Sequence, residues 1–210
     1  MSQQLLQSTE GADAHPREGA FRLDDGREAD IRPLRPDDHA LYREFGRHVT
    51  AEDHRLRFFG AGGGLSPRRA WALTHYDPAA ARAYVAVAPG TGAMLGVGRV
   101  HLTEPGRGEF AVLVRSDLKG QGLGRRLMDH VLEGATELSV DTLFGLVLRE
   151  NARMLALCRE LGFIVAPLTG EPGTVEVRRV RSDGAGQWPV ASASRVASNR
   201  NQVRRSVSSI

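Results

Sequence analysis

Cysteine is almost absent from this chain of 210 residues, because Cys158 is the only one. A single thiol cannot form an intramolecular disulfide, which excludes the disulfide-rich secreted scaffolds. The sequence also lacks an apolar run of 18 residues and a charged-then-apolar stretch near its start. We therefore expect neither a membrane-spanning helix nor a secretory signal, and these absences favour a cytoplasmic protein.

An excess of charge of one sign is missing from most of the chain. The formal net charge is +3, and residues 181–210 alone, with five Arg and one Asp, contribute +4. The rest of the chain therefore sums to −1. Because the positive charge is concentrated at one end, we expect the folded part to bind neither nucleic acid nor a membrane.

Hydrophobic periodicity is missing from both ends of the chain. Residues 1–27 are predicted to form a disordered N-terminal arm. Residues 181–210, which are rich in Ser, Gly, Ala and Arg, are predicted to form a disordered basic tail. One folded domain is expected between them, over residues 28–180.

Within that domain, the apolar residues alternate between helical and strand spacing. Segments 83–88 and 93–102 flank a Pro-Gly-Thr-Gly turn and should pair as a hairpin, whereas 174–180 is expected at a sheet edge. Strands are expected over 29–34, 83–88, 93–102, 109–114, 142–148 and 174–180, and helices over 37–49, 50–60, 66–76, 123–138 and 151–161. This order indicates a mixed α/β sheet with helices on both faces.

Three of the helix starts carry a side chain that can accept a hydrogen bond from the first turn. Thr50, Ser66 and Asn151 each stand just before an apolar-periodic segment, and Pro67 follows Ser66. Gly162 stands just after the last helix, where glycine commonly ends one. These residues predict where the helices begin and end.

A glycine-rich loop separates the buried strand 109–114 from the helix 123–138. Gly120, Gly122 and Gly124 leave backbone N–H groups free to point into one concavity, and the helix start adds its own unsatisfied N–H groups. Lys119 and Arg125, with Arg126, add positive charge. The arrangement favours an anion site, most often for phosphate, although a tight turn without a ligand has the same glycines.

The loop does not match the common nucleotide motifs. A G-x-x-x-x-G-K-[ST] phosphate loop is absent, and the dinucleotide fingerprint fails because Arg125 occupies the position of its third glycine. No acidic residue follows at the spacing that would hold a ribose. A nucleotide or nicotinamide ligand is therefore disfavoured.

Two longer stretches carry a resemblance. "VLVRSDLKGQGLGRRLMDHVL", followed by "LVLRENARMLALCRELGFIV", resembles the GCN5-related N-acetyltransferase (GNAT) family over about residues 28–180. "TAEDHRLRFFG" is also similar to a segment of the acetyltransferase domains of bacterial protein-lysine acetyltransferases. The resemblance implies the GNAT fold, a mixed and mostly antiparallel central sheet with helices on both faces and a splayed strand pair that holds acetyl-CoA.

The resemblance also implies which residues hold acetyl-CoA as cosubstrate. Main-chain groups of Val112 and Val114 would face the pantetheine arm, with 142–148 as the second splayed strand. Asn151 would bond the cofactor arm or serve only as a helix cap. The pyrophosphate would lie on the loop and the helix start, formed by Lys119, Gly120, Gln121, Gly122, Leu123, Gly124 and Arg125. Lys119 replaces the Gln or Arg that is usual in the family.

Catalysis in this family is direct attack of an amine on the thioester. Glu109 begins the strand that leads to the loop, and relatives often use a glutamate there as the base; an ordinary charged residue at a strand start is the alternative. Glu104, Glu150 and His101 are weaker candidates. Relatives often carry a Tyr near the thioester sulfur where this chain has Cys158, so protonation of the thiolate is left to water.

The acceptor is expected to be a protein lysine, with a small amine as the alternative. A non-catalytic module that senses acyl-CoA would share the glycine loop but need no base. No motif specifies an oligomeric state. The early helices, over 37–76, would line the acceptor groove or simply pack together; the residues considered there are Arg55, Arg57, Phe58, Phe59, Trp71 and Tyr76.

Overall fold

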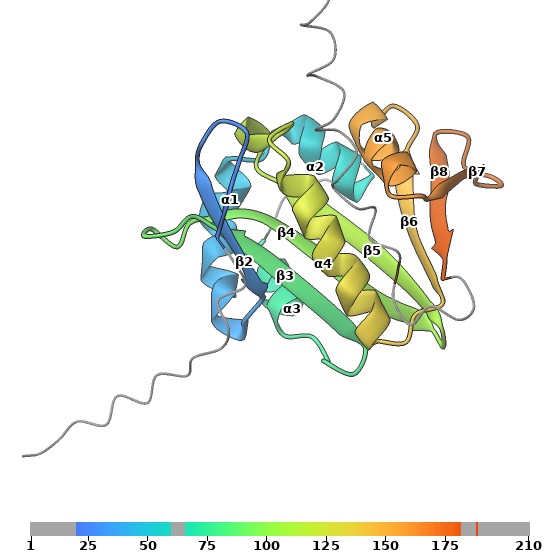
Figure 1. Cartoon of the computed structure of the whole chain (residues 1–210), viewed down its shortest axis with the longest axis horizontal. Coiled ribbons are helices and arrows are strands. Elements are labelled where there is room, and N and C mark those ends of the chain that lie inside the picture. The colour runs from blue at the N-terminus through green and yellow to red at the C-terminus, as the bar shows by residue number, and fades with distance from the viewer. Residues whose placement is uncertain (1–19, 60–65, 182–187, 189–210) are drawn as a thin grey trace, which may run out of the picture.

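The computed structural model describes residues 20–59, 66–181 and 188. Its strands form one sheet in the order β1-β2-β3-β4-β5-β6-β8-β7, in which β5 and β6 are parallel and the other neighbours antiparallel (Figure 1). The strands are β1 (Phe21–Arg22), β2 (Glu28–Pro33), β3 (Ala81–Val87), β4 (Met94–Glu104), β5 (Arg107–Val114), β6 (Thr142–Leu148), β7 (Ile164–Pro167) and β8 (Thr174–Val180). The helices are η1 (Pro36–Ala40), α1 (Leu41–Arg47), α2 (Ala51–Phe58), α3 (Pro67–Thr74), η2 (Ser116–Leu118), α4 (Leu123–Glu137) and α5 (Ala152–Glu160).

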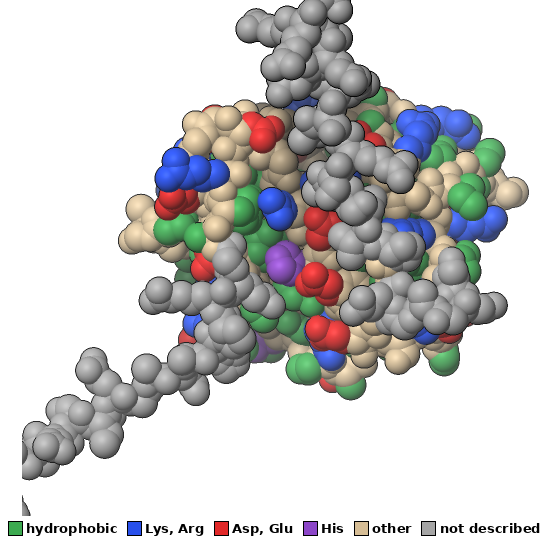
Figure 2. Space-filling view, in the orientation of Figure 1, with side chains coloured by type: hydrophobic (Ala, Val, Ile, Leu, Met, Phe, Trp, Pro, Cys, Tyr) green, Lys and Arg blue, Asp and Glu red, His purple; other side chains and the backbone are tan. Residues whose placement is uncertain are grey.

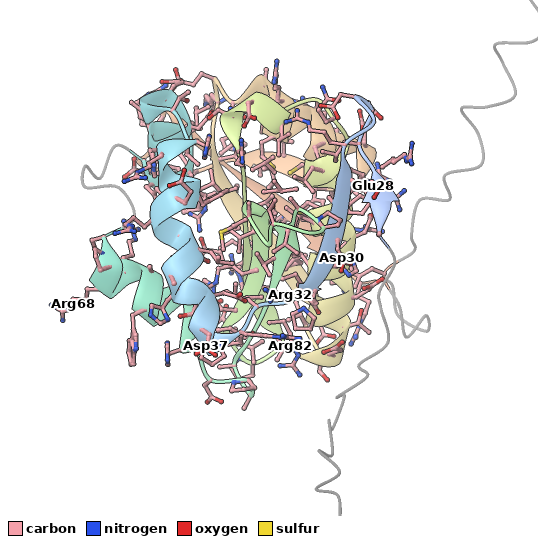
Figure 3. All side chains as sticks on the ribbon, turned by 90° about the vertical axis from the view of Figure 1, so that its left-hand side faces the viewer. Glu28, Asp30, Arg32, Asp37, Arg68 and Arg82 are labelled. Carbon is pink, nitrogen blue, oxygen red and sulfur yellow. The ribbon has the colours of Figure 1, made fainter. Side chains whose placement is uncertain are left out.

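Helices cover both faces of this sheet, as the apolar pattern predicted. The apolar side of α4, from Leu123 to Ala135, packs with Val100 and Phe110 on one face, and α5 adds to the same core. On the other face, Tyr42 and Phe45 of α1 form a second core with residues of α3, β3 and β4. Figure 3 shows the two layers on either side of the sheet.

Helix caps confirm the expected starts of three helices. Thr50 accepts a hydrogen bond from the Asp53 N–H, and Ser66 accepts one from the Arg69 N–H. Asn151 does the same for α5. Each cap satisfies an N–H group that the first helical turn leaves without a partner. The expected helix over 37–49 is instead divided into the 3-10 turn η1 and the helix α1.

The expected edge strand 174–180 is not at the edge. It is β8, and it pairs with β6 on one side and with β7 on the other. β7 has only four residues, and it ends at Pro167. Such a short segment after the α5 terminus shows little alternation of its own, so its pairing depends on the neighbouring strand.

Described residues on both sides of the predicted domain, 28–180, also pack against it. Phe21 and Arg22, which the sequence places in the N-terminal arm, form β1 against β2, and Leu23 is buried. Trp188, which was assigned to the basic tail, is also buried in the core of α4 and α5. In both places an apolar side chain within a polar stretch gains stability by leaving water.

No helix among the described residues has the length and apolar character to cross a bilayer. Figure 2 shows the face that carries α4, and basic, acidic and apolar side chains are interspersed on its uncovered part.

Candidate functional site

A groove opens where β5 and β6 part from each other. Their pairing covers only the first residues of each strand and ends with Glu109 opposite Phe144, although both strands continue. The cavity at this point has a volume of about 860 Å³. Its walls are β5, β6, α2, α5 and the loop that leads into α4.

The main chain of β5 is turned toward this groove at the two valines that the resemblance singled out. The Arg115 N–H donates to the Leu95 carbonyl of β4 at 2.9 Å. In an antiparallel pair, alternate residues bond to the same neighbour, so Val112 and Val114 direct their main-chain groups away from β4 and toward β6. Because β6 has already diverged there, these groups face the groove and can bond an extended ligand.

The glycine loop forms the far end of the groove. Gly120 and Gly122 have φ angles of +78° and +80°, which L side chains rarely adopt, and open space surrounds the position of a Cβ at both. Leu123 is fully buried and anchors the first turn of α4. The Arg125 N–H donates to the Gly122 carbonyl at 3.1 Å, whereas the N–H groups of Leu123 and Gly124 precede any helical acceptor, so the loop offers donors and positive dipole to an anion.

Two residues of the loop do not behave as the sequence suggested. The Lys119 ammonium, expected to be mobile, forms an ion pair with the buried carboxylate of Asp53 in α2. Asp53 also accepts a hydrogen bond from the Ser116 hydroxyl. Gln121 does not line the groove, and its Oε1 is buried without a hydrogen-bond partner. Lys119 therefore joins α2 to the loop, and it lines the groove together with Gly120, Gly122, Gly124 and Arg125.

Glu109 stands at the point where the strands part. Its side chain lines the groove, is about one third exposed (34%), and lies 3.6 Å from Nε2 of His101 on the neighbouring strand. Glu150 also lines the groove, but its carboxylate is paired with Arg55. Glu104 lies outside the groove. Glu109 is therefore the best-placed of the three carboxylates.

Asn151 lies beside the groove and already has one structural role. Its Oδ1 accepts a hydrogen bond from the Met154 N–H at 3.2 Å, which caps α5. The capping oxygen is thus occupied, and its amide NH₂ is the group that can serve a ligand. Both roles that the sequence left open are compatible with this position.

Cys158 is part of the core and not of the groove. Its side chain is fully buried among the residues of α4 and α5, and burial raises the pKa of its thiol to about 12. A neutral, inaccessible thiol is a poor nucleophile. The geometry therefore matches the interpretation of Cys158 as an apolar core residue.

The residues fit a coenzyme A thioester. The free β5 main chain suits an extended arm that bears amide groups, and the open cradle at Gly120 and Gly122 suits a pyrophosphate. No cluster of metal-ligating side chains lies among the residues that the structure describes. Arg99 of β4 is the residue that sequence reasoning missed, because its position beside the groove depends on strand pairing.

Comparisons with known proteins agree with this geometry. The family model described as acetyltransferase (GNAT) domain matches residues 30–164. Acetyltransferase PA5475 of Pseudomonas aeruginosa is 32% identical over 145 residues, which are 68% of this chain and 78% of that protein. The GNAT domain of S. lividans PAT has a TM-score of 0.70 at 24% identity and covers 78% of this chain and 96% of its own.

A further solved structure, the yncA protein of Salmonella typhimurium with its cofactor acetyl-CoA, has a TM-score of 0.61 at 17% identity. It covers 75% of this chain and 96% of its own, and at this identity the likeness concerns the fold alone. With most of the domain matched by the family model, this chain belongs to the GNAT family and is an acyl-CoA-dependent N-acetyltransferase with acetyl-CoA as its cosubstrate.

Proposed function

We propose that this enzyme transfers the acetyl group to the side-chain amine of a protein lysine, by direct attack within a ternary complex, with Glu109 as the base. The observation that carries this proposal is the end of β5–β6 pairing at Glu109. A carboxylate stands where the groove begins, on the strand whose free main chain would hold the thioester arm. The residues that the structure describes, 20–59, 66–181 and 188, contain every group named in this proposal.

Different groups of the chain bind different parts of acetyl-CoA. Main-chain groups of Val112 and Val114 bond the pantetheine amides. The N–H groups from Gln121 to Gly124 hold the pyrophosphate at the positive end of the α4 dipole. The Arg125 side chain, which also lies 3.4 Å from Asp129 and 3.8 Å from Glu160, adds positive charge. The Asn151 amide adds one donor to the arm. Together these contacts fix the thioester carbonyl beside Glu109, which lowers the entropic part of the barrier.

Glu109 removes the proton that prevents attack. A lysine ammonium has an ordinary pKa of about 10.4, so at neutral pH almost all of it lacks a nucleophilic lone pair. The carboxylate takes this proton directly or through one water, and the neutral amine then attacks the thioester carbon. No tyrosine lines the groove among the described residues, so water protonates the departing thiolate.

Two alternatives differ from this proposal in the acceptor or in the chemistry. A small amine would use the same groove and base. A sensor of acyl-CoA would bind the same ligand without turnover. The exposed side chain of Phe59 on the groove wall offers an apolar surface that a polypeptide can contact, which favours the protein acceptor.

The first prediction concerns the base. Glu109→Gln keeps the shape of the side chain but removes its basicity, so we expect kcat to fall by about 100-fold or more. The affinity for acetyl-CoA in calorimetry should stay the same. Glu104→Gln is the matched control, because it lies on the adjacent strand outside the groove and should leave both quantities unchanged. Full turnover in Glu109→Gln would remove Glu109 from this role, and binding without turnover in the wild type would favour the sensor.

A further inference from the structure

Two arginines beside Glu109 lack a carboxylate partner. Arg57 lies in the last turn of α2 and lines the groove. Arg99 lies on β4. Among the residues that the structure describes, no carboxylate oxygen comes within the 4.0 Å of an ion pair with either guanidinium. Both side chains are only partly exposed.

The strand register puts Arg99 on the same side of the sheet as the base. Arg99 pairs with Ala111 and His101 pairs with Glu109, so the four side chains share one face of the β4–β5 ladder. Arg99 and Glu109 are diagonal neighbours in this ladder, with Cβ atoms about 7 Å apart. Ala111 and Glu109 both line the groove, and Arg57 reaches it from α2.

Aromatic rings limit the freedom of the two guanidinium groups. The Arg57 guanidinium lies 4.8 Å from the centre of the Phe58 ring, and that of Arg99 lies 5.9 Å from the centre of the Tyr76 ring. These contacts leave the hydrogen-bonding edge of each planar group available to a ligand. The two guanidinium groups are thus held in place without a direct ion pair, and Glu109 is the carboxylate whose charge acts on Arg57 from beyond the 4.0 Å of an ion pair.

The electrostatics of the pair favour an added anion. Burial, and then the charge of Arg99, lower the pKa of Arg57 to about 10 against the opposing effect of the Glu109 charge, and burial lowers the pKa of Arg99. Arg57 stays charged at neutral pH. Two cations held partly out of water near each other raise the free energy of the protein, and a bound carboxylate relieves this cost.

Some other arginines of this layer have carboxylate partners. Arg55, two residues from Arg57 in α2, is paired with both Glu52 and Glu150. Arg32, on β2 and two strands away from β4, is paired with Asp38. Arg57 and Arg99 differ from these two arginines, and so does Arg69 of α3, which lies over the same Phe58 ring and has no carboxylate within 4.0 Å among the described residues. What distinguishes Arg57 and Arg99 is that they stand beside Glu109.

We propose that Arg57 and Arg99 bind an acidic side chain that lies next to the reacting lysine of a protein acceptor. Arginine is suited to this because its planar donors match both oxygens of a carboxylate. The acidic residue would fix the lysine at Glu109 and select among acceptor sequences. This inference rests on the proposed function and adds the chemical class of the acceptor.

The test uses two peptides that each contain one lysine and differ only at its neighbours, which are Glu in one and Gln in the other. We expect the full-length enzyme to acetylate the Glu peptide with a kcat/KM about tenfold higher or more. In Arg57→Gln and in Arg99→Gln this ratio should fall toward one. Arg68→Gln is the matched control, since Arg68 of α3 points away from the molecule in Figure 3, and its ratio should equal that of the wild type.

Equal kcat/KM for the two peptides in the wild type would overturn the inference while leaving the transferase function intact. The inference is also overturned if the preference for the Glu peptide is unchanged in both Arg57→Gln and Arg99→Gln. Acetylation of neither peptide, with acetyl-CoA still bound in calorimetry, would instead reject the protein acceptor of the proposed function. In that case 6-aminohexanoate and 6-aminohexanamide are compared, and equal turnover of the two would overturn the arginine site as well.

Discussion

Gly122 is the residue whose backbone shapes the anion cradle most directly. It is the N-cap of α4, and its φ angle of +80° is left-handed. A Cβ added at Gly122 would meet no atom within 4 Å, but an L residue is strained at this φ angle. The strain costs about 1–2 kcal/mol. The loop can escape this strain only by turning its N–H groups away from the groove.

We therefore expect Gly122→Ala to weaken acetyl-CoA binding by about tenfold and to lower the melting temperature. Gly46→Ala is the control, because Gly46 lies inside α1, has open space for a Cβ and no left-handed φ angle. It should stabilise the protein by about 0.5–1 kcal/mol without changing the affinity. Calorimetry and thermal melting measure both effects, and unchanged affinity in Gly122→Ala would remove the cradle from this loop.

At the residue scale, the sequence predicts what depends on near neighbours. The caps Thr50, Ser66 and Asn151 follow from hydrogen bonds three residues along the chain, and all three are present. The ion pair of Lys119 with Asp53 joins residues 66 positions apart, and no local pattern encodes it. The neighbourhood of Arg99 and Glu109 likewise depends on a strand register that only the folded sheet defines.

Among the elements, η1 is the one whose position depends most on charge. Arg32 donates two hydrogen bonds of 2.7 Å to Asp38, and the Arg35 N–H donates a third, also 2.7 Å. Burial raises the pKa of Asp38, but the bonds from Arg32 and Arg35 outweigh this and hold the pKa below its ordinary value of 3.8. The Arg32–Asp38 ion pair thereby holds η1, which connects β2 to α1, in place.

The stability that Asp38 provides depends on pH with a defined sign. Because its pKa is lower in the folded protein than in the unfolded chain, the stabilisation is complete above about pH 4 and is lost as the pH falls through the folded pKa. Asp38→Asn should cost about 2 kcal/mol at pH 7. Urea unfolding at pH 7 and pH 3 checks this: the gap between wild type and variant should shrink at pH 3. A constant gap would contradict the assignment.

The elements differ in how well the sequence indicates them. Strands 109–114 and 142–148 and helix 123–138 carry long apolar patterns, and each is found within two residues of its expected bounds. β7 is too short for such a pattern, and its absence from the prediction put β8 wrongly at the edge. The splay of β5 from β6 was implied by family resemblance, and the register now gives its position.

At the scale of the whole molecule, the two faces of the sheet have different roles. The core of α4 and α5 holds the glycine loop from one face, and the layer of α1, α2 and α3 brings Arg57 to Glu109 from the other. Trp188 closes the first core: its ring is 3% exposed, and the Arg179 guanidinium lies 5.4 Å from its centre. The stable unit thus includes a residue far beyond the last strand.

Trp188→Ala should therefore destabilise the enzyme by about 3 kcal/mol in urea unfolding. A chain shortened after Trp188 is the comparison, and it should unfold like the wild type and bind acetyl-CoA equally well. If the shortened chain were less stable than Trp188→Ala, the residues after Trp188 would contribute more to stability than Trp188 itself.

Binding of acetyl-CoA in the groove between β5 and β6, on the glycine loop, can be measured by calorimetric titration of the whole chain with acetyl-CoA and separately with ATP and NAD. We expect one molecule of acetyl-CoA to bind, and Gly122→Glu, which puts negative charge and bulk into the cradle, to abolish this binding. Equal affinity for ATP or NAD, or full acetyl-CoA affinity in Gly122→Glu, would contradict the account.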